Sequence, residues 1–145
     1  MGDAPRRVAL ACLAAAAALV LSSCASTGSR VSDAIDSAES ATASASIALG
    51  LYGDGRALPG LTDTVLGDAL TELGSAESDL SQLGPIGNSG AAKQRDAALA
   101  TIRAATDAVL AAREVVAAGG DPDDAVTVLD HVTDALHDFG GSSGS

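Results

Sequence analysis

The side chains available for a hydrophobic core are the strongest constraint on this sequence. Its 145 residues include one tyrosine, one phenylalanine and no tryptophan, although hydrophobic residues make up 47% of the chain. A core must therefore be built from alanine, leucine, valine and isoleucine. Alanine is the best helix former, and alanine-rich faces let helices approach one another closely. This composition predicts an all-α domain.

Four segments have the spacing of amphipathic helices. Apolar residues recur there at steps of three and four, and glycine-rich turns separate the segments. The expected helices span residues 30–52, 62–83, 91–118 and 122–139, and the second of them could also begin at residue 59. Because short turns join antiparallel neighbours, we expect a four-helix up-down-up-down bundle over residues 30–139.

Each expected helix has one face that should point into the core. On the first helix this face consists of Val31, Ile35, Ala38, Ala41 or Thr42, Ala45, Leu49 and Tyr52. On the second it consists of Leu66, Leu70, Leu73, Ala76, Leu80 and Leu83. On the third it consists of Leu99, Ile102, Thr106, Val109 and Val116. On the fourth it consists of Val128 or Leu129, Val132, Leu136 and Phe139.

The pattern leaves two questions open. Serine and threonine are frequent over residues 37–46, and they compete with helical hydrogen bonding, so this segment is either helical or disordered. Residues 68–74 resemble residues 134–140, which indicates either a duplicated helical hairpin or chance similarity in a biased composition.

The expected helix ends follow from capping residues. Ser29 is the predicted N-cap of the first helix, and Asp121 is the predicted N-cap of the fourth, with Pro122 at its first position. Residues 24–29 would then form a short polar linker, and residues 140–145 a flexible tail.

The N-terminus has the pattern of a secretory signal. Arg6 and Arg7 precede the uncharged, largely apolar run of residues 8–21. A basic segment followed by about 7–15 apolar residues is typical of such signals. A transmembrane helix needs about 20 apolar residues, so this run is too short for a permanent span. Residues 1–23 are therefore predicted to be a cleaved signal peptide.

The apolar run ends in Leu21-Ser22-Ser23-Cys24, with leucine at −3, small residues at −2 and −1, and cysteine at +1. This resembles the lipobox of bacterial lipoproteins. The resemblance implies cleavage between Ser23 and Cys24, and attachment of acyl chains such as palmitate at Cys24. The protein would then be anchored to the extracytoplasmic face of the cell membrane. An ordinary signal peptide, with Cys24 an incidental thiol, is the alternative. The alanine- and glycine-rich composition with a single lysine is similar to that of actinobacterial proteins.

The mature chain would be strongly acidic. Removal of residues 1–23 takes away two arginines and one aspartate, which leaves 6 basic and 18 acidic residues, a net charge of −12. Such a surface is repelled by nucleic acid and by anionic lipid headgroups, which excludes a nucleic-acid-binding function. Four of the six bases fall in the third helix, where we expect them to balance acids on neighbouring helices. They are Lys93, Arg95, Arg103 and Arg113.

The sequence carries no motif for catalysis. It has no nucleophile-elbow motif, no phosphate-binding loop and no glycine-rich dinucleotide turn. The acids at 121–124 do not match a calcium loop, because Ala125 and Val126 stand where an acid or amide and a glycine are required. We therefore expect no enzyme activity and no cofactor.

The two histidines, His131 and His137, lie six residues apart and so about 120° apart around a helix. With Asp134 or Asp138 they would have the spacing to touch a divalent ion. The chain lacks the usual zinc-ligand motifs, so solvated positions on the helix surface are the expectation, and no metal is assigned.

These features favour a lipid-anchored, non-catalytic helical protein that acts through contacts with an envelope protein. The bundle would collect two turns at the end far from the anchor, and turns carry binding function more often than helix faces. The expected partner-facing residues there are Tyr52, Asp54, Arg56, Asp121, Asp123 and Asp124. One alternative is a small-ligand or divalent-metal-binding lipoprotein accessory to a transporter. Another is an envelope component that contacts peptidoglycan, against which the lack of aromatic residues argues.

Overall fold

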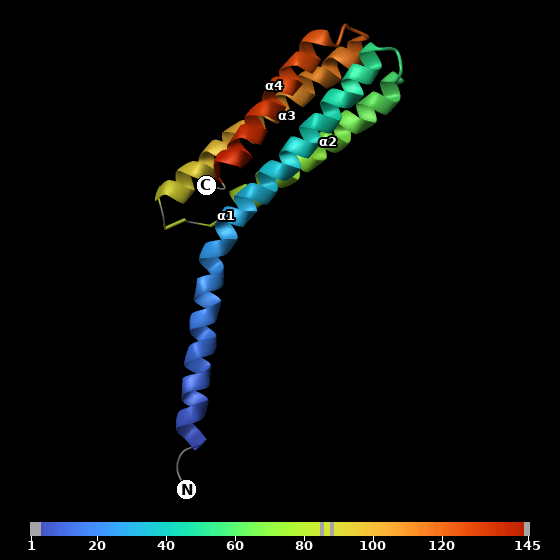
Figure 1. Ribbon diagram of the computed structural model, residues 1–145. Coiled ribbons are helices and arrows are strands. Elements are labelled where there is room, and N and C mark those ends of the chain that lie inside the picture. The colour runs from blue at the N-terminus through green and yellow to red at the C-terminus, as the bar shows by residue number, and fades with distance from the viewer. Residues whose placement is uncertain (1–3, 85, 88, 144–145) are drawn as a thin grey trace.

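The protein is a four-helix bundle in this computed structural model (Figure 1). The structure describes the backbone of residues 4–84, 86–87 and 89–143, and the side chains of residues 28–84, 86–87 and 89–142. The helices are α1 (Ala4–Gly53), α2 (Pro59–Ser81), α3 (Ser89–Ala118) and α4 (Asp123–Ser143). The predicted all-α four-helix fold is confirmed.

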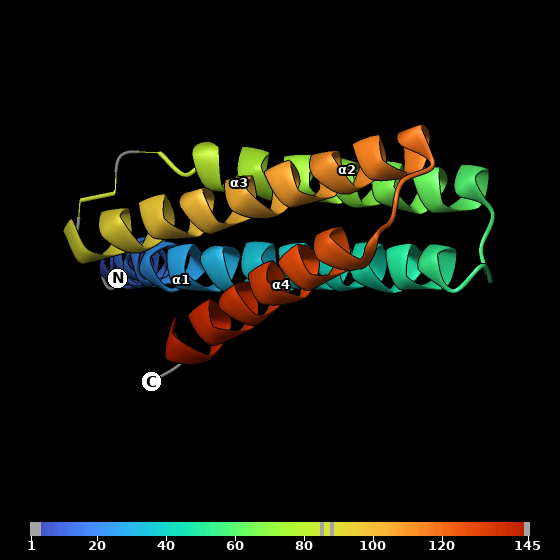
Figure 2. The same ribbon diagram turned by 90° about the horizontal axis from the view of Figure 1, so that it is seen from above.

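Successive helices run in opposite directions (Figures 1 and 2). Each helix packs against its neighbours in the ring, α1 also reaches α3 across the bundle, and α2 and α4 do not touch within the described residues. Figure 2 shows that α4 crosses the bundle at an angle and diverges from α3 towards its own C-terminus. The α1–α2 and α3–α4 turns lie together at one end, which we call the distal end. The α2–α3 turn and the C-terminus of α4 lie at the proximal end (Figure 1).

The core is continuous and follows a heptad spacing. The buried residues of α2 alternate at steps of four and three; they are Thr62, Leu66, Ala69, Leu73, Ala76 and Leu80. The same steps occur on α3, at Ala98, Ile102, Ala105, Val109, Ala112 and Val116. This spacing produces the left-handed packing of four-helix bundles. Among the residues whose side chains are described, the buried core extends from Val31 to Leu136 and includes residues of all four helices.

Most predicted core positions of α1 and α2 are buried, but Leu70 is only half-buried and Ala69 beside it is buried. The predicted positions of α3 need the same correction. Leu99 and Thr106 are only half-buried, and the fully buried positions beside them are Ala98 and Ala105. Alanine at these positions brings the backbone of α3 close to the other helices. The buried face is therefore set by close packing of small residues, and the prediction gave too much weight to residue size.

The serine- and threonine-rich segment of α1 is helical rather than disordered. Thr42 is fully buried, and its hydroxyl donates to the carbonyl oxygen of Ala38 at 2.7 Å. The hydroxyl of Ser46 donates to a carboxylate oxygen of Asp130 on α4. Because both buried hydroxyls have acceptors, they lie in the bundle without the cost of an unpaired polar group.

Two predicted ends lie inside helices. Residues 25–29 continue α1, so Ser29 is a helical residue and not an N-cap, and no extended linker precedes the bundle. Residues 140–143 belong to α4 and not to a flexible tail. Gly140 packs against α1, since a Cβ atom built on it would lie 3.6 Å from Cγ2 of Ile35. This contact explains why the helix continues past Phe139.

The start of α4 is shifted by one residue from the prediction. The helix begins at Asp123, and its first helical bond runs from the Val126 N–H to the Pro122 carbonyl oxygen at 2.9 Å. Asp121 still caps the helix, because its Oδ1 accepts a hydrogen bond from the Asp123 N–H at 3.1 Å. Pro122 therefore takes the N-cap position and Asp121 the position before it.

Candidate functional site

The two distal turns surround an open hollow of about 540 Å³, which we call the tip hollow. It is lined by Tyr52, Gly53, Gly119, Gly120, Asp121, Pro122 and Asp123. The structure thus brings together three of the six predicted partner-facing residues, Tyr52, Asp121 and Asp123. The other three are exposed but do not line the hollow: Asp54 and Arg56 belong to the α1–α2 connection, and Asp124 to the first turn of α4.

Both helices that lead into the tip end in the same way. At the end of α1, Gly55 has a φ of +69°, and the Arg56 N–H donates to the Leu51 carbonyl oxygen at 2.8 Å. At the end of α3, Gly119 has a φ of +64°, and the Gly120 N–H donates to the Val115 carbonyl oxygen at 2.9 Å. These are Schellman motifs, which need a left-handed residue that glycine supplies without strain. The backbone of the tip is therefore fixed by hydrogen bonds.

Gly53 joins the two turns. A Cβ atom built on it would lie 2.8 Å from Cγ of Pro122, which is closer than a side chain tolerates. The Pro122 ring is buried and rigid, so it cannot move aside easily. Glycine at position 53 is therefore what allows the α1–α2 turn to lie against the start of α4.

We expect Gly53→Ala to destabilise the fold and Gly50→Ala to stabilise it. The first substitution forces an overpacked contact with Pro122, at a cost of about 1–3 kcal/mol. The second adds a methyl group inside α1 where no atom lies within 4 Å, and helical alanine is about 0.5–1 kcal/mol more favourable than glycine. Urea denaturation of both variants measures the change in the free energy of unfolding. Equal changes would contradict the close approach of Gly53 to Pro122.

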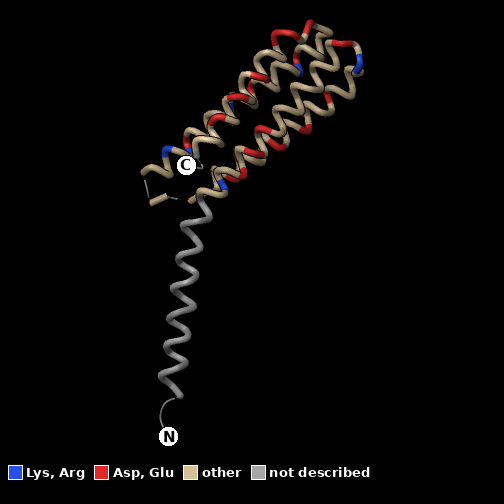
Figure 3. Tube along the Cα trace, viewed as in Figure 1, with Lys and Arg blue, Asp and Glu red and all other residues tan. Residues whose placement is uncertain are grey.

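The tip has more negative than positive charge. Asp54 and Arg56 lie in the α1–α2 connection, and Asp121, Asp123 and Asp124 lie just before or at the start of α4. Figure 3 shows acidic segments on both turns at this end of the bundle. Tyr52 adds a half-buried aromatic ring. Carboxylates around an aromatic ring and open glycine backbone are suited to polar contacts with a cationic protein surface.

The expected charge balance exists between α3 and α2 for two of the four bases, whereas Arg95 pairs with Asp96 on its own helix. Arg113 binds Asp63 with two hydrogen bonds, of 2.8 and 3.2 Å, and Arg103 binds Glu77 at 2.7 Å. The hydrogen bonds from Arg113 lower the pKa of Asp63 and raise the pKa of Arg113 itself. These arginines therefore hold two helices together at the surface, where such pairs contribute modestly.

Among the described side chains, neither histidine of α4 forms a metal-binding group with Asp134 or Asp138. His137 Nδ1 lies 3.1 Å from Oε1 of Glu39 on α1, and His131 is exposed. Among the described side chains, no group of three histidine, cysteine or acidic residues is arranged to hold a metal ion.

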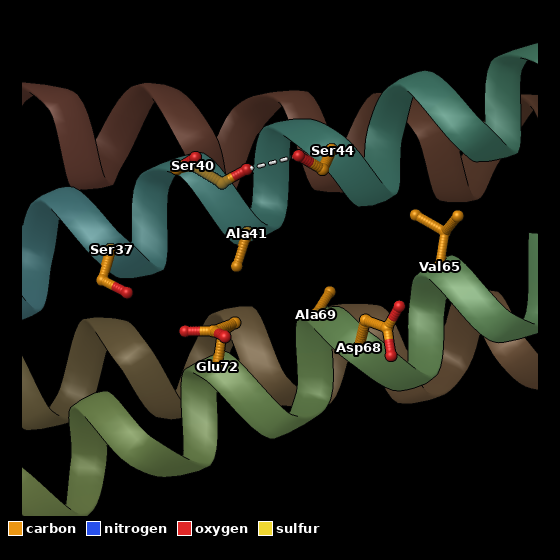
Figure 4. A pocket seen from close by; sticks show the side chains of 8 residues that line it. All are labelled: Ser37, Ser40, Ala41, Ser44, Val65, Asp68, Ala69 and Glu72. Atoms are coloured by element: carbon orange, nitrogen blue, oxygen red, sulfur yellow. Dashed lines mark hydrogen bonds between the residues drawn. The ribbon is translucent and has the colours of Figure 1, made fainter.

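A second surface feature was not predicted from the sequence. A groove of about 410 Å³ runs between α1 and α2, with three serines on one wall and Val65, Asp68 and Glu72 on the other (Figure 4). The serines are Ser37, Ser40 and Ser44. The hollowed surface continues towards the proximal end, past Glu72 to Asp79 and Gln82. We call the whole feature the seam groove. The sequence contains a signal for it, in the serines and acids that repeat at three- and four-residue steps on α1 and α2.

The predicted processing residues Ser23 and Cys24 lie outside the residues whose side chains the structure describes. Within the part of the chain that was searched, no helix is long and apolar enough to cross a membrane. Comparison with known proteins gives no match to a family model, a curated protein or a solved structure.

Proposed function

We propose that this chain is a lipid-anchored, non-catalytic protein of the extracytoplasmic membrane face, which binds another envelope protein through its distal tip. The observation that carries the proposal is the position of the tip hollow. Its two turns come together at the end of the bundle opposite to the one at which α1 enters (Figure 1). The lipobox-like sequence before Cys24 supplies the anchor.

The anchor and the tip are related by simple geometry. Residues 24–29 are part of α1, so about 9 Å of helix would separate Cys24 from Arg30, at 1.5 Å per residue. The 23 residues of α2 span about 35 Å. An anchor at Cys24 would therefore hold the proximal end near the membrane surface and present the tip several tens of ångströms away from it.

The double variant Tyr52→Ala/Arg56→Ala tests the tip. Tyrosine and arginine are enriched among residues whose truncation weakens protein interfaces most, so we expect partner recovery to fall about tenfold or more. The measurement is quantitative co-purification of crosslinked envelope proteins from intact cells. Lys93→Ala, on an exposed position near the proximal end of α3, is the control and should leave recovery within about twofold. Unchanged recovery with the double variant would contradict the proposal.

A further inference from the structure

Helix α2 carries acids on both of its flanks, and the ion pairs found among the described residues join α2 to arginines on the α3 side. On the α3 side, the acids bind the arginines described above. On the α1 side, Asp68 and Glu72 face serines across the seam groove (Figure 4). Neither carboxylate has a hydrogen bond or an ion pair with another residue among those described. The middle of the seam groove, around Asp68, therefore has no arginine or lysine among its lining residues, whereas Arg30 lines its proximal part together with Asp33 and Asp79.

The distal continuation of the groove is apolar. Ile47 follows the wall residue Ser44 by three positions, and Leu61 precedes the wall residue Val65 by four, so each extends its wall by one helical turn. Ile47 is 66% exposed and Leu61 is 61% exposed. These two side chains give the distal end of the groove an apolar character.

The floor and walls of the groove are regular enough for a further helix to pack on them. Its floor contains the small buried residues Ala41 and Ala69, which allow a close approach. Its walls repeat at the three- and four-residue steps that a further helix uses for packing. From Leu61 to Asp79 the α2 wall rises about 27 Å, which matches a straight helix of about 18 residues.

We propose that the seam groove binds an amphipathic helix of a partner protein. The apolar residues of that helix would lie over Ile47 and Leu61, and its lysines or arginines over Asp68 and Glu72. Charge complementarity selects this occupant, because a second copy of the chain would bring another acidic surface to an acidic groove. The inference depends on the proposed role in protein contacts, but it concerns a surface other than the tip.

The test uses the full-length chain in the cells that produce it. Photoreactive benzoylphenylalanine replaces Ser44 in the groove, Ala111 on the exposed side of α3 as a control, or Asp121 at the tip. We expect Ser44 to give an adduct whose mapped peptide is an amphipathic helix with basic residues, and Ala111 to give none. In the background Asp68→Asn/Glu72→Gln the Ser44 adduct should fall about tenfold, because two charge pairs are lost. The matched pair Asp107→Asn/Glu114→Gln on α3 makes the same change in net charge and should leave the yield within about twofold.

The results separate the two proposals. An adduct at Asp121 without one at Ser44 would overturn the groove inference and leave the tip proposal standing. If the yield of the Ser44 adduct falls equally in the α2 and the α3 double variants, the loss is a general effect of net charge and the inference is overturned. An adduct between two copies of this chain, or with a peptide that has no basic residues, would also overturn it.

Discussion

Leu73→Ala is expected to lower the free energy of unfolding by about 2–5 kcal/mol, the range for truncation of a fully buried leucine. Leu73 is 0% exposed and lies near the middle of α2. Small domains are stable by only about 5–15 kcal/mol, so this loss is a large share of the total. We place the effect in the upper half of the range because the core is rich in alanine. An alanine side chain has no rotamer with which to fill a cavity.

Leu61→Ala is the matched control, since it makes the same substitution on the same helix. Leu61 is 61% exposed, and exposed sites usually change stability by no more than about 0.5 kcal/mol. Urea denaturation of the chain lacking residues 1–23, followed by circular dichroism at the helical band, compares the two variants. Equal losses would contradict the assignment of Leu73 to the core and of Leu61 to the surface.

The fold was predictable because four apolar stripes at heptad steps have few other ways to be buried. Leu66, Leu73 and Leu80 identify the inner face of α2, and they are all fully buried. The inner face of α3 was harder to predict. Ala98, Ala105 and Ala112 lie at core positions because α1 comes close to α3 across the bundle, and single-sequence reasoning cannot know the distance between two helices.

The site was predictable to the extent that it follows from topology. An up-down-up-down bundle brings the α1–α2 and α3–α4 turns together, so Tyr52 and Asp121 were expected to be neighbours, and both line the tip hollow. The contact between Gly53 and Pro122 depends on the tertiary approach of two turns and has no local signal. The seam groove was missed because its serines and acids look like a solvated surface until α1 and α2 are placed side by side.

The second large effect is expected at Cys24. If this residue carries the lipid anchor, Cys24→Ala removes the thiol to which a diacylglyceryl group is attached. Each buried CH₂ group of an acyl chain contributes about 0.8 kcal/mol to membrane binding, and two chains give stable anchoring. We therefore expect the variant to lose the lipid-modified mature form, to be blocked in cleavage after Ser23, and to show an altered distribution between membrane and soluble fractions.

Cys12→Ala is the control for the loss of a cysteine. Cys12 is the only other cysteine in the chain and lies within the predicted signal peptide, so its replacement should leave lipidation and cleavage unchanged. Intact-mass spectrometry of the protein extracted from membranes distinguishes the lipid-modified mature chain from the unprocessed one. If Cys24→Ala is processed and retained in the membrane like Cys12→Ala, the anchor is not at Cys24. The proposed direction of the tip relative to the membrane would then lose its basis, because it depends on a short helical tether between Cys24 and Arg30.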